Sequence, residues 1–183
     1  MKPLYLLILA ALIGAAIGFA VVLYNSHSWE SDMSGASSEA SSPPNISIPE
    51  GRYVVILGSL GCPHCRALKA FFEDKLPGVA LFCSIDARDS TCARAFASLV
   101  TARITMGVPT SVVCDNSSRR VVAIVLGEYG DVAGWRQLLN LSPAQRIPVY
   151  TGSSIVGYVE PRDHTEFYKL LCLDTLQDAE RLG

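Results

Sequence analysis

The segment RYVVILGSLGCPHCRALKAFFEDKLPG, residues 52–78, is the most informative part of this chain. Its first part, 52–60, is a β-branched, apolar run of strand length. In its second part, apolar side chains recur at helical spacing at Leu68, Phe71, Phe72 and Leu76. A Pro-Gly pair then ends the pattern. The segment therefore predicts a strand followed directly by a helix over 63–75, with two cysteines at the junction.

The alternation of strands and helices continues after residue 78. Strands are expected at 79–86, 110–114 and 120–127, and helices at 91–103 and 132–141. Strand–helix alternation followed by a hairpin predicts an α/β fold with a mixed central sheet flanked by helices on both faces. We expect a domain over 51–183, with a core at 51–141.

The pattern partly recurs after Pro143, in the form of a hairpin (147–150 and 155–160) and a helix (161–173). We interpret 142–183 as an extension of the same domain. A short segment of independent origin is the alternative.

The sequence Cys62-Pro63-His64-Cys65 opens the predicted helix. Unsatisfied N–H groups at a helix N-terminus favour a thiolate on Cys62, and Pro63 is well suited to the first turn. As an imidazolium, His64 would favour that thiolate further. Cys65 is close enough in sequence to form a disulfide with Cys62. A stabilised thiolate makes the disulfide a better oxidant, so the segment predicts a redox pair with Cys62 as nucleophile and Cys65 as resolving thiol.

Two other interpretations of this cysteine pair remain open. A CxxC can be half of a zinc site, but the sequence contains no second CxxC and no HxxxH, so we predict no metal site. The pair could also form an inert structural disulfide. The redox interpretation is favoured because the pair lies at a strand-to-helix junction.

Residues 51–141 resemble the thioredoxin superfamily. The resemblance rests on Cys62-Pro63-His64-Cys65 and on Gly107-Val108-Pro109-Thr110 before the third strand. It implies a thioredoxin fold in which the Val108–Pro109 bond is cis and lies beside the redox pair. The backbone of Val108 would then pair with an extended substrate. An ordinary trans proline in a turn is the alternative.

Within that superfamily, the CPHC pair and Val108 resemble the DsbA-type protein oxidases. The chain departs from them because only 43 residues separate Cys65 from Pro109, which leaves no room for their helical insertion. It also has Ile56 where many relatives carry a buried carboxylate. The resemblance implies a thiol:disulfide oxidoreductase that exchanges its disulfide with protein thiols, and the oxidase direction fits best.

The same resemblance suggests a quinone-linked reoxidising partner in the membrane, of the DsbB or vitamin-K-epoxide-reductase (VKOR) kind. It implies no metal and no organic cofactor. One alternative is a thiol reductase or isomerase supplied with electrons from the cytoplasm. Another is a thioredoxin-fold subunit that captures cysteine-bearing partners for a membrane complex without turnover.

Four further cysteines are widely spaced singles. In an oxidising compartment they allow three pairings. We favour Cys83–Cys92, which closes a short strand-to-helix loop, together with Cys114–Cys172, which would tie the last helix to the core. Buried free thiols and a second shuttle pair are the alternatives.

The N-terminal residues predict where the domain lies. Residues 4–24 form an uncharged run of 21 residues. As a helix, this run spans about 31 Å, enough to cross a bilayer core of about 30 Å. We predict a signal-anchor transmembrane helix over 1–24, a Ser/Pro-rich tether over 25–50 and an extracytoplasmic domain attached to the cell membrane. A cleaved signal peptide is the alternative.

Charge argues against one class of partner. The chain has 15 basic and 17 acidic residues, and residues 51–183 carry 14 and 13 of them. Binding to nucleic acid depends on a basic excess that neutralises phosphates. We therefore expect no nucleic-acid partner.

Overall fold

A computed structural model describes residues 51–182 of the chain. In these residues a seven-stranded sheet has the strand order β6-β5-β4-β3-β1-β2-β7. β1 is parallel to β2 and β4 is parallel to β5, whereas the other neighbours are antiparallel. The strands are β1 (Arg52–Gly58), β2 (Ala80–Ser84), β3 (Thr110–Asp115), β4 (Arg120–Leu126), β5 (Ile147–Thr151), β6 (Ser154–Val159) and β7 (Ala179–Leu182).

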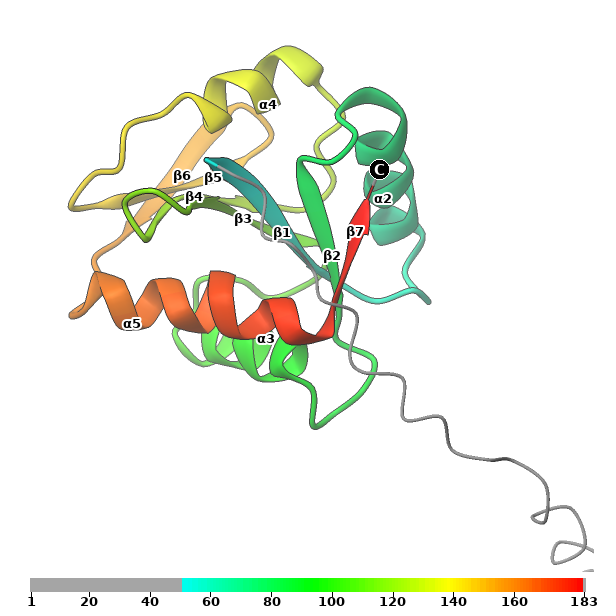
Figure 1. The fold of residues 1–183 in the computed structure, drawn as a ribbon, viewed down its shortest axis with the longest axis horizontal. Coiled ribbons are helices and arrows are strands. Elements are labelled where there is room, and N and C mark those ends of the chain that lie inside the picture. The colour runs from blue at the N-terminus through cyan, green and yellow to red at the C-terminus, as the bar shows by residue number, and fades with distance from the viewer. Residues whose placement is uncertain (1–50, 183) are drawn as a thin grey trace, which may run out of the picture. The chain divides into compact units, whose positions relative to one another are not determined.

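Helices cover both faces of this sheet. α2 (Pro63–Lys75) and α4 (Val132–Leu139) lie on one face, and α3 (Thr91–Thr101) and α5 (His164–Tyr168) lie on the other (Figure 1). The prediction of an α/β fold with a mixed sheet between helices is confirmed.

The central strand β1 explains why both faces are covered. Its side chains from Tyr53 to Leu57 are all fully buried. Since neighbouring residues of a strand point to opposite faces, such a run has to be covered from both sides. Tyr53, Val55 and Leu57 pack in the core beneath α3 and α5. Val54 and Ile56 pack in the core beneath α2 and α4, which includes Trp135.

The C-terminal region differs from the expected hairpin and single helix. The hairpin is present as β5 and β6, but the helix starts at His164 rather than at residue 161. α5 then continues through a π-helical turn, η1 (Lys169–Leu173), and a 3-10 turn, η2 (Asp174–Asp178). The chain ends in β7, which pairs antiparallel with β2 and was not predicted. Four residues with two charges carry too little hydrophobic pattern to identify a strand.

Both predicted disulfides are present. Cys83 at the end of β2 bonds Cys92 in α3, with their Cα atoms 5.4 Å apart. Cys114 of β3 bonds Cys172 of η1, with their Cα atoms 6.1 Å apart. All four cysteines are fully buried, so both bonds hold the core beneath α3 and α5.

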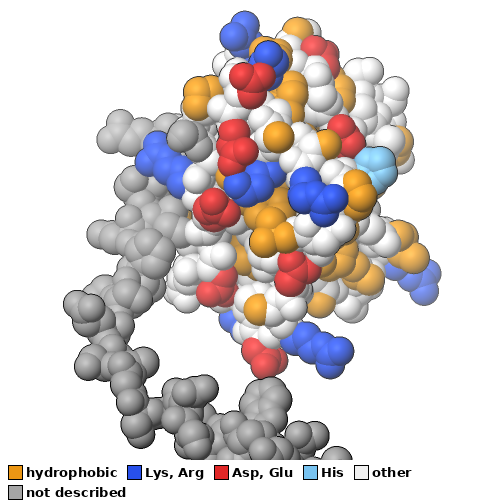
Figure 2. Space-filling model, turned by 90° about the vertical axis from the view of Figure 1, so that its right-hand side faces the viewer, with side chains coloured by type: hydrophobic (Ala, Val, Ile, Leu, Met, Phe, Trp, Pro, Cys, Tyr) orange, Lys and Arg blue, Asp and Glu red, His pale blue; other side chains and the backbone are white. Residues whose placement is uncertain are grey.

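The face of the molecule that carries α2 and β7 is a mixture of positive, negative and hydrophobic side chains (Figure 2). Lys69 of α2 illustrates this, since its ammonium pairs with Glu73 at 2.6 Å and with Glu180 of β7 at 3.5 Å. Exposed pairs of this kind contribute less than about 1 kcal/mol each to stability.

The predicted membrane helix at 1–24 and tether at 25–50 lie outside the described residues. Within 51–182, no helix has the length and apolar character needed to span a membrane.

Candidate functional site

Cys62 is the N-cap residue of α2. Its backbone is extended, with φ −84° and ψ 123°, and Pro63 occupies the first helical position. The loop before it is closed by a hydrogen bond from the Cys62 N–H to the carbonyl of Ser59 at 3.1 Å. The thiol of Cys62 is half-buried, and that of Cys65, one turn along the helix, is fully buried. Both are free thiols in this structure, which therefore describes the reduced pair.

The predicted substrate segment lies beside this pair. The Sγ atom of Cys62 is 3.9 Å from the carbonyl oxygen of Val108. The Val108–Pro109 bond is cis, in agreement with the implication of the resemblance. The structure therefore brings the two motifs together, although 46 positions separate Cys62 from Val108.

Sequence reasoning missed the hydroxyl groups that hold the loop before Pro109. The hydroxyls of Thr105 and Thr110 lie 2.9 Å apart, and each donates a hydrogen bond to the carbonyl of Gly107 at 2.9 Å. Both side chains are buried, where such hydrogen bonds are costly to lose. Thr110 belongs to the motif that carries the resemblance, but nothing in the sequence indicates the role of its hydroxyl or distinguishes Thr105 from other threonines near a turn.

The two thiols have opposite electrostatic environments. Hydrogen bonds from the Cys65 N–H and thiol lower the pKa of Cys62, and the His64 N–H and the charge of Arg66 add to this effect. Burial raises the pKa of Cys65 from 9.0 to about 11. The half-buried sulfur of Cys62 is thus stabilised as a thiolate, while the fully buried sulfur of Cys65 is kept protonated.

The imidazole of His64 contacts an acidic residue that the sequence interpretation did not include. Its Nδ1 atom lies 2.9 Å from Oε2 of Glu128, in the loop after β4. What His64 contributes to the lowered pKa of Cys62 is its backbone N–H rather than its imidazole. His64 and Glu128 line a shallow groove, and its other lining residues are Val108, Pro109, Gly127 and Gly130. Glu128 was not predicted, because a single exposed acid in a loop has no distinguishing pattern.

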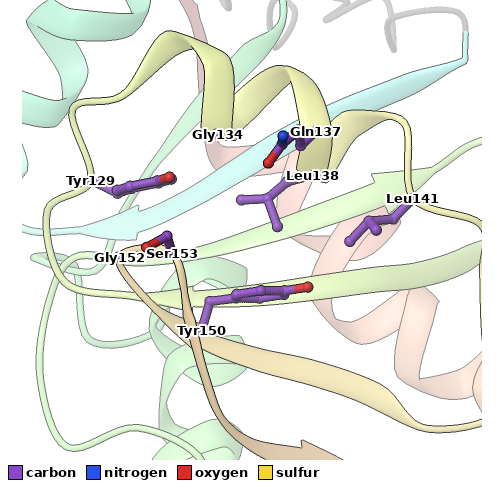
Figure 3. A pocket seen from close by; sticks show the side chains of 8 residues that line it. All are labelled: Tyr129, Gly134, Gln137, Leu138, Leu141, Tyr150, Gly152 and Ser153. Carbon is purple, nitrogen blue, oxygen red and sulfur yellow. The ribbon is translucent and has the colours of Figure 1, made fainter.

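A second pocket lies between α4 and the β5–β6 hairpin and has a volume of about 110 Å³ (Figure 3). None of the predicted site residues lines it. Its lining residues are Tyr129, Gly134, Gln137, Leu138, Leu141, Tyr150, Gly152 and Ser153. A Cβ atom on Gly134 would lie 1.8 Å from the hydroxyl of Tyr129, so this pocket depends on glycine at that position.

No group of three or more metal-ligating side chains is found among the described residues. The cysteines at 83, 92, 114 and 172 are used in disulfides, so they are not available to complete a zinc site with Cys62 and Cys65.

Gly58 at the end of β1 leaves the space that the buried thiol of Cys65 occupies. A Cβ atom at this position would lie 3.0 Å from Sγ of Cys65 and 3.2 Å from a ring carbon of Phe82. Gly58→Ala should therefore lower the free energy of unfolding by about 1–3 kcal/mol, as overpacking of a core does. Urea unfolding of the reduced protein measures the loss. Gly107→Ala is the control, because a Cβ atom there meets nothing within 4 Å. Equal losses in the two variants would contradict the prediction.

The pKa of Cys65 also predicts a stability change at alkaline pH. Because folding raises this pKa from 9.0 to about 11, the stabilisation is complete below pH 9 and is lost as the pH rises towards 11. A rise of the pKa from 9.0 to about 11 corresponds to at most about 2–3 kcal/mol. The measurement is urea unfolding of reduced wild type and reduced Cys65→Ala across this range. The difference is needed because burial also raises the pKa of Tyr53, which affects both proteins equally. Parallel pH profiles for the two proteins would contradict the prediction.

Comparison with models of known protein families, with curated proteins and with solved structures finds no match to this chain.

Proposed function

We propose that this chain is a membrane-tethered thiol:disulfide oxidoreductase with a thioredoxin fold. It acts on the extracytoplasmic side and transfers the Cys62–Cys65 disulfide to protein substrates. The observation that carries the proposal is the position of the Cys62 thiol, half-buried at the start of α2 and 3.9 Å from the carbonyl of Val108. The element order of the core and the cis bond at Pro109 support the proposed fold.

The proposed reaction follows from the two sulfurs. A substrate thiolate attacks Sγ of Cys62 in the oxidised pair, and the Cys65 sulfur leaves and takes up a proton. The substrate's second thiolate then attacks the substrate sulfur of this mixed disulfide, and Cys62 leaves as a thiolate. The pair has gained two electrons, and the substrate has gained a disulfide. A quinone-linked membrane partner would remove those electrons.

The opposite pKa shifts of the two thiols favour the oxidase direction. A lowered pKa makes Cys62 the better leaving group and stabilises the reduced pair, so the oxidised pair readily gives up its disulfide. Ile56 also favours the oxidase direction. It packs in the same core as Cys65, where a reductase could use a carboxylate to accept the proton of the buried thiol.

The groove beside Cys62 is the proposed substrate site. Val108 and Pro109 line it together with His64 and Glu128. A peptide that lies extended along the backbone of Val108 would bring its cysteine to Sγ of Cys62. Recognition through backbone atoms suits an enzyme that has to accept many sequences.

Two measurements on the full-length protein test the proposal. Thiol trapping in glutathione buffers gives the redox potential of the Cys62/Cys65 pair, which should lie well above the value of about −270 mV for thioredoxin. The oxidised protein should also restore disulfides to a reduced, unfolded test protein, with repeated turnover when an oxidant is added. A potential near that of thioredoxin would overturn the oxidase direction and favour a reductase. A complete lack of disulfide transfer would leave only the binding subunit.

A further inference from the structure

The peptide groups of Leu60, in the loop that leads into Cys62, are held from both sides. The Leu60 N–H donates a hydrogen bond to Oδ2 of Asp86 at 3.0 Å. The Leu60 carbonyl accepts one from Nη1 of Arg66 at 2.8 Å. One residue is therefore fixed between a carboxylate and a guanidinium, two positions before the proposed nucleophile.

Asp86 is itself fixed to the end of β2. Its Oδ2 atom accepts a hydrogen bond from the Ser84 hydroxyl at 3.0 Å, and its N–H donates to that hydroxyl at 3.3 Å. Hydrogen bonds from the Ser59 hydroxyl, the Leu60 N–H and the Ser84 hydroxyl keep the pKa of Asp86 below its ordinary value, so it is a carboxylate at neutral pH. Pairing between the Ile85 N–H and the Gly58 carbonyl at 2.9 Å joins this segment to the end of β1.

The two charges act on different thiols. The positive charge of Arg66 contributes to the lowered pKa of Cys62, and the negative charge of Asp86 contributes to the raised pKa of Cys65. The two thiols also interact with each other through the hydrogen bond between them, which lowers the pKa of Cys62 and raises that of Cys65.

We propose that Asp86 and Arg66 are positioning residues of the dithiol site, because they fix the Leu60 peptide from both sides and carry opposite charges next to the pair. Arg66 follows Cys65 in α2, and Asp86 follows the residue that pairs with Gly58, whose Cβ position lies 3.0 Å from Sγ of Cys65. This inference deepens the proposed function and rests on it for its consequence. The sequence gives no sign of Asp86, because an acid after a strand is ordinary and its role depends on a contact across 26 positions.

The consequence concerns the mixed disulfide between Cys62 and a substrate. If Cys65 is a thiolate, it attacks Sγ of Cys62, re-forms the internal disulfide and returns the substrate thiolate unchanged. If Cys65 stays protonated, the substrate's second thiolate completes the transfer and Cys62 leaves. By disfavouring the Cys65 thiolate, Asp86 directs the intermediate towards oxidation of the substrate.

Asp86→Asn separates charge from hydrogen bonding, because the amide oxygen can still accept from Leu60. It should lower the pKa of Cys65 and leave that of Cys62 nearly unchanged, with roughly two- to threefold more Cys65 thiolate at a given pH. Arg66→Gln should do the converse and reduce the Cys62 thiolate by a similar factor. The pKa values of both thiols are measured by carbon NMR of the labelled cysteine β-carbons in the full-length reduced protein. High salt should diminish both pKa changes.

Asp89→Asn is the matched control, since it removes the same charge from the same loop without a contact to Leu60. The proposal is overturned if Asp86→Asn leaves the pKa of Cys65 where it was, or if Asp86→Asn and Asp89→Asn shift it equally. The titration needs no substrate, so it remains decisive even if wild type transfers no disulfide and the proposed function fails. If wild type is active, Asp86→Asn should return the substrate reduced roughly two to three times more often.

Discussion

Cys62→Ser is expected to reduce disulfide transfer to the background rate, a loss of about 10³-fold or more. Serine preserves the size of the side chain but cannot form a disulfide with Cys65 or with a substrate. The remaining thiol, Cys65, is fully buried and its pKa is raised to about 11, so it cannot take over the reaction. The assay is the rate at which the oxidised protein restores disulfides to a reduced, unfolded test protein.

The Cys65→Ala variant complements this test. It keeps the half-buried thiol of Cys62 but cannot form the internal disulfide. When its Cys62 thiolate attacks a disulfide of an oxidised test protein, one sulfur of that disulfide leaves as a thiolate, and the covalent complex should accumulate because no Cys65 thiol is present to release it. Non-reducing electrophoresis separates these complexes from the free protein. Transfer by Cys62→Ser at the wild-type rate, or complexes formed through Cys65, would show that Cys62 is not the nucleophile.

Loss of the Cys114–Cys172 disulfide is expected to have the largest effect on stability. The two cysteines are 58 positions apart, and the bond joins β3 to the π-helical turn η1. A cross-link of this loop length stabilises a fold by about 4 kcal/mol by restricting the unfolded chain. Removal of both cysteines as Cys114→Ala/Cys172→Ala should therefore lower the free energy of urea unfolding by that amount.

The Cys83–Cys92 disulfide provides the comparison. It is equally buried but closes a loop of only 9 positions, for which the same argument gives about 2–3 kcal/mol. The smaller loss should therefore be found in Cys83→Ala/Cys92→Ala. A reversed order of the two losses would mean that contacts in the folded state, rather than the entropy of the unfolded chain, dominate the effect.

The core of the site could be predicted because its signals are local. A strand-length apolar run, a proline at the first helical position and two cysteines three positions apart all lie within residues 52–75. The structure has the strand and the helix at this place, with Cys62 as the N-cap. The sequence did not indicate the partner of the His64 imidazole, because this contact depends on Glu128, which is 64 positions away.

The end of the chain shows where local pattern fails. The hairpin β5–β6 was predicted from its alternation, whereas β7 was not, since a short amphipathic segment becomes a strand only when an open sheet edge accepts it. The helix before β7 was predicted to end near residue 173, but π-helical and 3-10 turns continue it to Asp178. These turns lead the chain back to the free edge of β2.

The alternation of strands and helices, the position of the cysteine pair at a helix N-terminus and the favoured pairing of the other four cysteines could all be predicted from the amino-acid sequence. Periodicity and helix capping act over a few neighbouring residues, so they can be read without a structure. The contact of Glu128 with the His64 imidazole and the hydrogen bonds of Asp86 and Arg66 to Leu60 became apparent only in the folded chain. The contacts made by Glu128 and Asp86 join residues far apart in the chain, and packing brings them together without leaving a local pattern.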